Sequence, residues 1–202
     1  MSIEGLRFGA IERAVHICID MQGLFAEETE WASPAVHDIA PQVAQICAHS
    51  PERTIFTRFL TPDRIEDAKG QWKVFYRRWS SVLASRLHRG IFDLVPQLRK
   101  FAPPARVIDK FAYSGFEDTA LQTIANELGA TTVILTGVET DVCVLATALT
   151  AIDRGYRTVL VSDATASSEP TGHQACLDGI LTRYGEQVEL IDSATLLGAW
   201  KP

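Results

Sequence analysis

The sequence has few cysteines and no pair of them in a CxxC spacing, which limits the chemistry that the chain can support. The four cysteines are scattered: Cys18, Cys47, Cys143 and Cys176. Structural zinc sites need closely spaced Cys and His ligands, and disulfide-stapled domains need a dense set of cysteines. We therefore expect free thiols, no bound metal ion and no other cofactor.

The chain also lacks a long apolar run and an excess of basic charge. No stretch reaches the ~20 apolar residues that span a bilayer, and the first residues do not combine a basic start with an apolar run, as a secretory signal does. The formal net charge is −6, which disfavours a general nucleic-acid binder because phosphates are bound by basic surfaces. We expect a cytoplasmic protein with a small-molecule partner and with neither nucleic acid nor membrane as a partner.

What the sequence does contain is a regular alternation of short apolar runs with helical patterns. Apolar strands that alternate with helices form a parallel sheet covered on both faces. The pattern therefore predicts an α/β fold of three layers (αβα), Rossmann-like, with about six parallel strands in a single domain of residues 1–202. The expected strands are residues 14–20, 53–60, 105–110, 131–137, 157–164 and 187–192. No GxGxxG follows the first of them, which disfavours a dinucleotide-binding oxidoreductase.

Three polar residues stand at or just after the ends of expected strands: Asp20, Lys110 and Cys143. Each alone has a structural explanation, since a buried Cys packs as a small apolar residue, an Asp often forms a turn and a Lys is usually solvated. Together they suit attack on a carbonyl carbon. A thiol at a helix start beside a lysine is favoured as thiolate, and a carboxylate can take its proton and return it to a leaving amine. The helix is expected over residues 141–156, with Asp141 as its cap.

Around these residues, three stretches resemble the isochorismatase-like cysteine hydrolase superfamily, which includes nicotinamidase and N-carbamoylsarcosine amidase. They are ICIDMQGLF, VIDKFAYSGFEDTAL and ILTGVETDVCVLATALTAIDRGYRTVLVSDATAS. The resemblance implies that Asp20 is the general base and acid, Lys110 the positioning cation and Cys143 the nucleophile. It also implies a cis peptide between Val138 and Glu139, with the backbone N–H groups of Glu139 and Cys143 as the oxyanion hole.

The resemblance favours a cysteine hydrolase that cleaves the C–N bond of a small amide or ureide through a thioester on Cys143. The presence of this cysteine disfavours an isochorismatase-type, non-amide hydrolase, which stays an alternative. A catalytically inactive binding protein on the same fold is the rival from another class. The resemblance further implies a homodimer or homotetramer. Metal-assisted nicotinamide hydrolysis is disfavoured, because no histidine lies between His49 and His88.

Residues 61–104 interrupt the alternation of strands and helices. This insertion contains WKVFYRRW. It is expected to be a lid over the substrate, where aromatic residues and arginines would cover an anionic ligand, or a subunit interface, where Trp, Tyr and Arg are enriched. A plain surface helix and loop is the remaining alternative. If the substrate is anionic, arginine side chains would bind its carboxylate. For Arg58 the alternative role is a structural ion pair. The candidate substrate-binding residues are Phe25, Arg58, Trp72, Tyr76 and Arg77.

Overall fold

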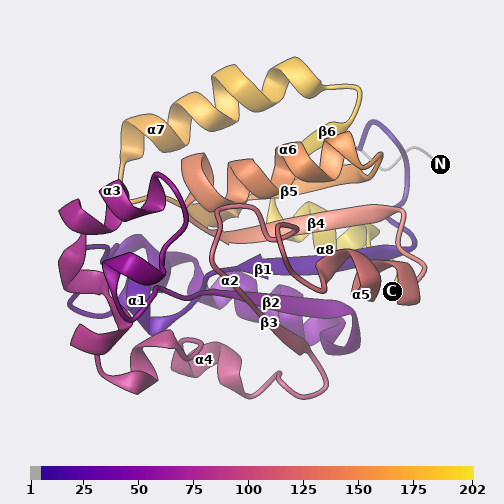
Figure 1. Cartoon of the computed structure of the whole chain (residues 1–202). Helices are drawn as coiled ribbons and strands as arrows, with labels where there is room; N and C mark the ends of the chain where they lie inside the picture. Colours follow the sequence, from indigo (N-terminus) through magenta and orange to yellow (C-terminus); the bar gives the residue numbers. More distant parts are fainter. Residues whose placement is uncertain (1–5) are drawn as a thin grey trace.

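Six parallel strands form one sheet in the computed structural model, which describes residues 6–202. Their order across the sheet is β3-β2-β1-β4-β5-β6, and every neighbouring pair runs parallel (Figure 1). The strands are β1 (Ala14–Ile19), β2 (Thr54–Phe59), β3 (Arg106–Lys110), β4 (Thr132–Val138), β5 (Arg157–Ala166) and β6 (Val188–Ile191). The expected parallel sheet is confirmed, and each strand begins and ends within about two residues of its predicted bounds, as strand boundaries commonly do.

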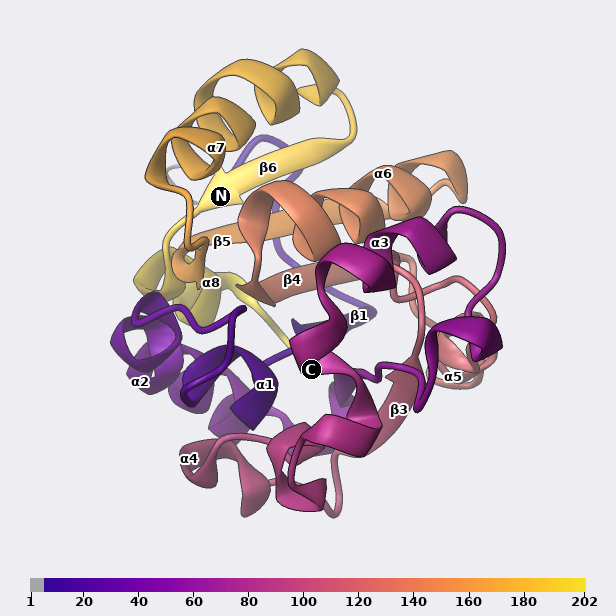
Figure 2. The same cartoon turned by 60° about the vertical axis from the view of Figure 1, so that its left-hand side comes forward.

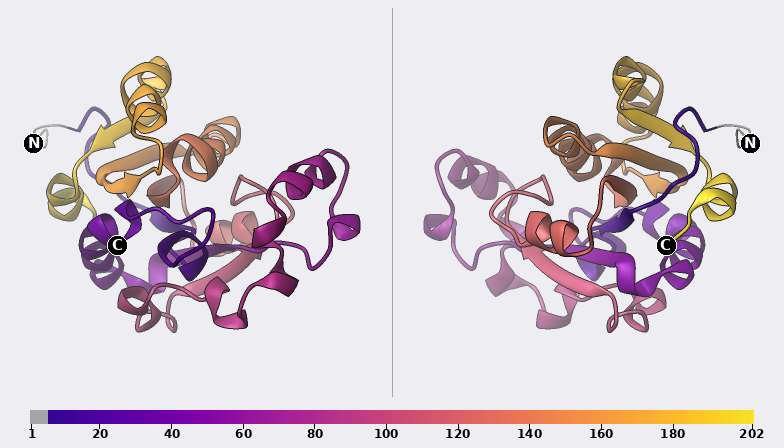
Figure 3. Two further views of the ribbon diagram at one scale, coloured as in Figure 1. Left: turned by 90° about the vertical axis from the view of Figure 1, so that its left-hand side faces the viewer. Right: turned by 90° about the vertical axis from the view of Figure 1, so that its right-hand side faces the viewer.

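The strands form at these positions because both faces of the sheet are covered. Every residue of the central strands β1 and β4 is buried, so the sequence there is mostly apolar on both faces. Two of the buried polar exceptions, His16 and Thr136, hydrogen-bond each other at 2.8 Å. Helices α2 and α8 pack on each other along one face, and α6 lies on the other (Figure 3). The three layers expected from the sequence are therefore present.

The helices differ in length, and several are only one or two turns long. They are α1 (Gly23–Ala26), α2 (Ala35–His49), α3 (Trp72–Arg78), α4 (Pro96–Arg99), α5 (Leu121–Glu127), α6 (Leu145–Asp153), α7 (Pro170–Gln174) and α8 (Ser193–Ala199). The helix expected over residues 141–156 begins differently, because Thr140–Val144 forms a π-helical turn before α6. Within residues 6–202, no helix is both long enough and apolar enough to cross a membrane.

The strand order reverses between β1 and β4. The chain adds β2 and β3 on one side of β1, then returns to place β4 on its other side and continues to β5 and β6. In such sheets the crevice at the reversal point, outside the carboxyl ends of the strands, is the usual place for a ligand. Helix α3, from the segment 61–104, lies with α1 in front of these strand ends (Figure 2).

Candidate active site

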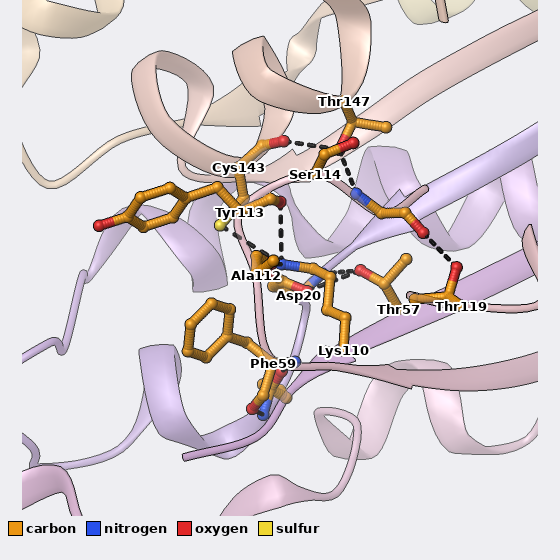
Figure 4. Close-up of polar contacts among 12 residues, drawn as sticks. Asp20, Thr57, Phe59, Lys110, Ala112, Tyr113, Ser114, Thr119, Cys143 and Thr147 are labelled. Carbon is orange, nitrogen blue, oxygen red and sulfur yellow. Dashed lines mark hydrogen bonds and ion pairs between the residues drawn. The ribbon is translucent and has the colours of Figure 1, made fainter. Parts of the chain in front are cut away.

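The structure brings the three polar residues from the strand ends into contact (Figure 4). Asp20 follows β1, Lys110 is the last residue of β3, and Cys143 lies in the π-helical turn after β4. The Lys110 Nζ atom is 2.8 Å from Asp20 Oδ2 and 3.5 Å from Cys143 Sγ. The side chains of Asp20 and Lys110 have no exposed surface, and Cys143 is 4% exposed. The reversal of strand order thus places a carboxylate, an ammonium and a thiol together.

The Lys110 ammonium is held by four groups around it. Besides Asp20 and Cys143, it donates to the carbonyl oxygens of Ala112 at 3.0 Å and Tyr113 at 3.1 Å. Its Nζ atom also lies 4.6 Å from the centre of the Phe59 ring, which contributes a cation–π attraction. An ammonium has three donor hydrogens, so these acceptors use its full hydrogen-bonding capacity and fix its position.

The Thr57 hydroxyl orients the Asp20 carboxylate. Thr57 was not among the site residues expected from the sequence. The Thr57 hydroxyl donates to Asp20 Oδ1 at 2.6 Å, and the Asp20 backbone N–H donates to the Thr57 carbonyl at 3.2 Å. Thr57 is buried on β2 two residues before Phe59, so both side chains point to the same face of the sheet. The signal available in the sequence was a threonine that stands two residues before Phe59, near the end of β2.

Burial sets the protonation of the Cys143 thiol. Desolvation raises the pKa of Cys143 well above its ordinary value; the Lys110 charge lowers it, but the Asp20 charge and hydrogen bond raise it again. For Lys110, burial lowers the pKa, but the negative charges of Asp20 and Cys143 raise it above its ordinary value. The lysine acts in the expected direction, but burial outweighs it, so the net pKa of the thiol is raised. A raised pKa favours the protonated thiol, which calls for a base to take the proton before the sulfur attacks.

The turn between β4 and Cys143 has an unusual backbone. Gly137 has φ +104°, and a Cβ atom at this position would lie 2.0 Å from the Ile19 carbonyl oxygen, so only glycine fits. The peptide bond between Val138 and Glu139 is cis. The Glu139 side chain accepts from the Ser168 backbone N–H at 2.9 Å.

Asp141 does not cap the helix, contrary to the sequence-based prediction. The Thr140–Val144 turn has no side-chain hydrogen bond at its cap. The Asp141 carboxylate instead accepts from the Ser167 hydroxyl at 2.6 Å, after β5. It therefore ties the turn that carries Cys143 to the neighbouring strand end, a contact between distant segments that local sequence could not reveal.

A cavity of about 330 Å³ opens onto Cys143. Phe25, one of the expected substrate-binding residues, lines it, and so do Phe59 and Tyr113. Two further lining residues, Phe75 and Trp79, belong to the motif WKVFYRRW that the sequence pointed to. The cavity is also lined by residues that the sequence analysis missed: Glu30, Trp31, Ala32, Val142 and Ser168. Its walls are therefore mainly aromatic, with a few polar groups, as in many small-molecule sites.

Helix α3 presents one stripe of aromatic residues, and the two halves of that stripe line different cavities. Phe75 and Trp79, four residues apart, line the cavity at Cys143. Trp72 and Tyr76, also four residues apart, line a second cavity of about 850 Å³ with Ala112 and Phe111. Trp72 and Tyr76 therefore do not line the Cys143 cavity itself, and a contact of either with the substrate stays a prediction.

The two arginines expected at the substrate lie away from the Cys143 cavity. Arg58 donates two hydrogen bonds to Asp109 at 2.7 and 3.0 Å and lies 3.5 Å from Asp93. It follows Thr57 on β2, so its side chain points to the opposite face of the sheet. Arg77 is exposed on α3 and lines neither cavity. Arg58 therefore forms the structural ion pair that the sequence analysis gave as its alternative role.

Residues 6–202 contain no group of three or more His, Cys, Asp or Glu side chains arranged to hold a metal ion. In the segment 61–104, the Asp67 carboxylate is occupied by Arg64, whose Nη2 atom lies 2.8 Å from Asp67 Oδ1.

Comparison with known proteins agrees with the fold. The isochorismatase domain model matches residues 14–192. Nicotinamidase 3 of Arabidopsis thaliana is 36% identical over 165 residues, which are 81% of this chain and 78% of that protein. Ureidoacrylate amidohydrolase RutB of Serratia proteamaculans is 28% identical over 203 residues, covering 90% and 81%. The segments matched in the first two curated relatives span only 36% and 31% of those proteins.

Among solved structures, a cysteine hydrolase from Pseudomonas syringae pv. phaseolicola superposes with a TM-score of 0.79 at 24% identity, covering 93% of this chain and 92% of that one. This similarity shows a shared three-layer fold. The family model extends over most of the chain, including the carboxyl ends of β1, β3 and β4. The chain belongs to the isochorismatase domain family.

Proposed function

We propose that this protein is a cysteine hydrolase that cleaves the C–N bond of a small amide or ureide. The observation that carries the proposal is the buried contact of Lys110 Nζ with Asp20 Oδ2 and Cys143 Sγ beside an open cavity. A thiol next to a carboxylate is the arrangement needed for nucleophilic catalysis. Two relatives named as a nicotinamidase and an ureidoacrylate amidohydrolase support the choice of a C–N bond.

In the first half of the reaction, Asp20 takes the proton of the Cys143 thiol. The thiolate sulfur then forms a bond to the substrate carbonyl carbon, and the carbonyl oxygen becomes an oxyanion. The C–N bond breaks as Asp20 returns its proton to the nitrogen, and ammonia or an amine leaves. Lys110 stabilises the thiolate by its charge and keeps Asp20 in place through the ion pair. The product of this half is a thioester on Cys143.

In the second half, water attacks the thioester carbon. Asp20 takes a proton from this water, the C–S bond breaks, and the sulfur recovers the proton as the acid leaves. In both halves the backbone N–H groups of Glu139 and Cys143 are the proposed oxyanion hole. One such donor typically raises the rate of the chemical step by about 10²–10³. Phe25 is the proposed substrate contact among the residues named from the sequence, since it lines the cavity with Cys143.

The test is ammonia release from a panel of small amides and ureides, with wild type, Cys143→Ala and the control Cys47→Ala. Cys47 lies on α2 and lines neither cavity, so its variant should keep the activity. Mass spectrometry of the protein mixed with a turned-over substrate should show an adduct on Cys143. Turnover that survives in Cys143→Ala would contradict the proposal. A homo-oligomer and a cytoplasmic location stay predictions from the sequence.

A further inference from the structure

The cavity at Cys143 has a distinctive charge pattern. Among the residues that line it within the described range 6–202, two are glutamates, Glu30 and Glu139, and none is Lys, Arg or His. A substrate carboxylate placed here would lie in one small cavity with two acidic side chains. Like charges at close range in partly buried surroundings repel strongly. The lining therefore disfavours an anionic substrate and favours a positive charge.

The nearby cations do not change this balance. Lys110 is buried and does not line the cavity, and it is already shared by Asp20 and Cys143 and by the carbonyl oxygens of Ala112 and Tyr113. Its ammonium has no donor left for a substrate carboxylate. Arg78 is exposed on α3, and its guanidinium lies 4.9 Å from the centre of the Trp79 ring without lining the cavity.

The aromatic walls add a second, independent feature that suits a cation. Trp31 is the centre of the wall, since it stacks on Phe25 with 6.0 Å between ring centres. Its ring centre is also 5.9 Å from Phe59, 5.7 Å from Phe75 and 6.3 Å from Trp79. All five rings line the cavity. Aromatic faces attract cations through their quadrupole, and several faces around one site form the cages that recognise quaternary ammonium groups.

Two of these rings already lie near cations of the protein itself, which leaves Trp31 as the ring next to Glu30 for a cation of the substrate. The Lys110 ammonium lies 4.6 Å from the centre of Phe59, and the Arg78 guanidinium lies 4.9 Å from that of Trp79. Glu30 stands next to Trp31 in sequence and is exposed at the same cavity. Its carboxylate therefore adds an attraction for a cation that lies against the Trp31 ring.

We propose that the substrate is an amide or ureide that also carries a cationic group, such as an alkylammonium or a guanidinium. The carbonyl carbon lies at Cys143, and the cation lies against the aromatic wall near Glu30. This inference rests on the proposed function, because that function supplies the reacting amide. It also replaces the expectation of an anionic substrate held by arginines.

The first experiment measures binding and does not depend on hydrolysis. Choline is compared on the wild-type protein with dimethylbutanol, in which carbon replaces the charged nitrogen, and with the anion pivalate. Isothermal titration should give a dissociation constant for choline that is lower than that for dimethylbutanol by about tenfold or more, the size of a desolvated cation–π contribution. Dimethylbutanol that binds as tightly as choline, pivalate that binds more tightly, or no saturable choline binding would each overturn the inference.

A matched pair of variants tests the part assigned to Glu30. Glu30→Gln should weaken choline binding about fivefold, the loss of one attractive charge near the surface, and leave dimethylbutanol unchanged. Glu28→Gln makes the same change of charge two residues away, at an exposed residue that lines neither cavity, and should leave both unchanged. Equal effects of the two variants on choline would contradict a specific role for Glu30.

The second experiment uses the reaction. Betaine amide, with its quaternary ammonium, is compared with its uncharged carbon analogue dimethylbutanamide, and kcat/KM should be about tenfold or more higher for the cationic amide. If neither amide nor any other C–N substrate is turned over while choline selectivity holds, the proposed function fails and the cation site stands. If an anionic amide is turned over best, the cation site fails and the proposed function stands.

Discussion

Replacing Asp20 by asparagine removes one charge from an ion pair that has no access to solvent. The Asp20 and Lys110 side chains are both 0% exposed, and their charged atoms are 2.8 Å apart. When one partner of a buried pair is lost, the other charge stays in surroundings of low dielectric constant without compensation. We expect Asp20→Asn to lower the free energy of unfolding by about 3–5 kcal/mol at neutral pH and to abolish hydrolysis.

The pH dependence of this loss identifies its cause. In the wild type, burial lowers the pKa of Lys110, but the charges of Asp20 and Cys143 raise it above the ordinary value. The wild-type ion pair therefore contributes stability that is fully present below the ordinary lysine pKa and is lost as the pH rises through the folded-state pKa.

In Asp20→Asn the main opposing charge is gone, and burial should bring the Lys110 pKa below its ordinary value. The unfolded chain then binds more protons than the folded one, so the stability of the variant rises with pH. The deficit relative to the wild type should therefore shrink between neutral pH and about pH 10.

Urea unfolding followed by far-UV circular dichroism at several pH values measures the deficit. Asp109→Asn is the matched control, because it breaks the partly exposed Arg58–Asp109 pair, whose side chains are 27% and 39% exposed. That change should cost less than about 1 kcal/mol. The double variant Asp20→Asn/Lys110→Met should recover most of the loss, since it removes the buried charge. A deficit that is independent of pH, together with no recovery in the double variant, would refute the reasoning.

Three further perturbations test other parts of the site. Thr57→Val removes the hydroxyl that donates to Asp20 Oδ1 at 2.6 Å. Because a hydrogen bond to a charged group contributes about 1.5–3 kcal/mol, kcat/KM should fall about 10- to 100-fold. An unchanged kcat/KM would show that Thr57 only fills space. The rate at which iodoacetamide alkylates Cys143, followed by peptide mass spectrometry, should rise steadily as the pH increases above neutral, because burial raises the pKa of the thiol. An alkylation rate that is already constant at neutral pH would show a thiolate and contradict the raised pKa. Gly137→Ala should lower the free energy of unfolding by more than about 3 kcal/mol, because its Cβ would lie 2.0 Å from the Ile19 carbonyl oxygen. The control Gly198→Ala, in α8 with open space around it, should stabilise by about 0.5–1 kcal/mol, and similar stabilities for the two variants would contradict the steric explanation.

Local sequence was least informative where the chain departs from regular structure. The helix expected over residues 141–156 is replaced at its start by the π-helical turn Thr140–Val144. The Asp141 carboxylate, expected to cap that helix, accepts from Ser167, which is 26 positions away in the chain. A capping side chain competes with every other donor within reach, and only the folded chain decides which donors those are.

The sequence also could not predict in which direction the side chains of helix α3 point. The motif WKVFYRRW predicted aromatic and arginine contacts to a substrate, but it could not say how α3 is rotated on its neighbours. In the structure Phe75 and Trp79 line the Cys143 cavity, while Trp72 and Tyr76 line the neighbouring one. A helix advances about 100° per residue, so a small rotation changes which residues face a site.

The parallel sheet, and the edge of it at which the polar residues gather, could be predicted from the order of residues alone. Strands buried on both faces are mostly apolar, so they can be recognised in the sequence, and parallel strands bring their carboxyl ends to one edge, where Asp20, Lys110 and Cys143 stand. The electrostatics of the site, in contrast, depend on the folded chain. Burial raises the pKa of the Cys143 thiol, contacts through space use all the donor hydrogens of the Lys110 ammonium, and the cavity has acidic and aromatic walls. These depend on distances between segments that are far apart in the sequence, and no local pattern of residues encodes such distances.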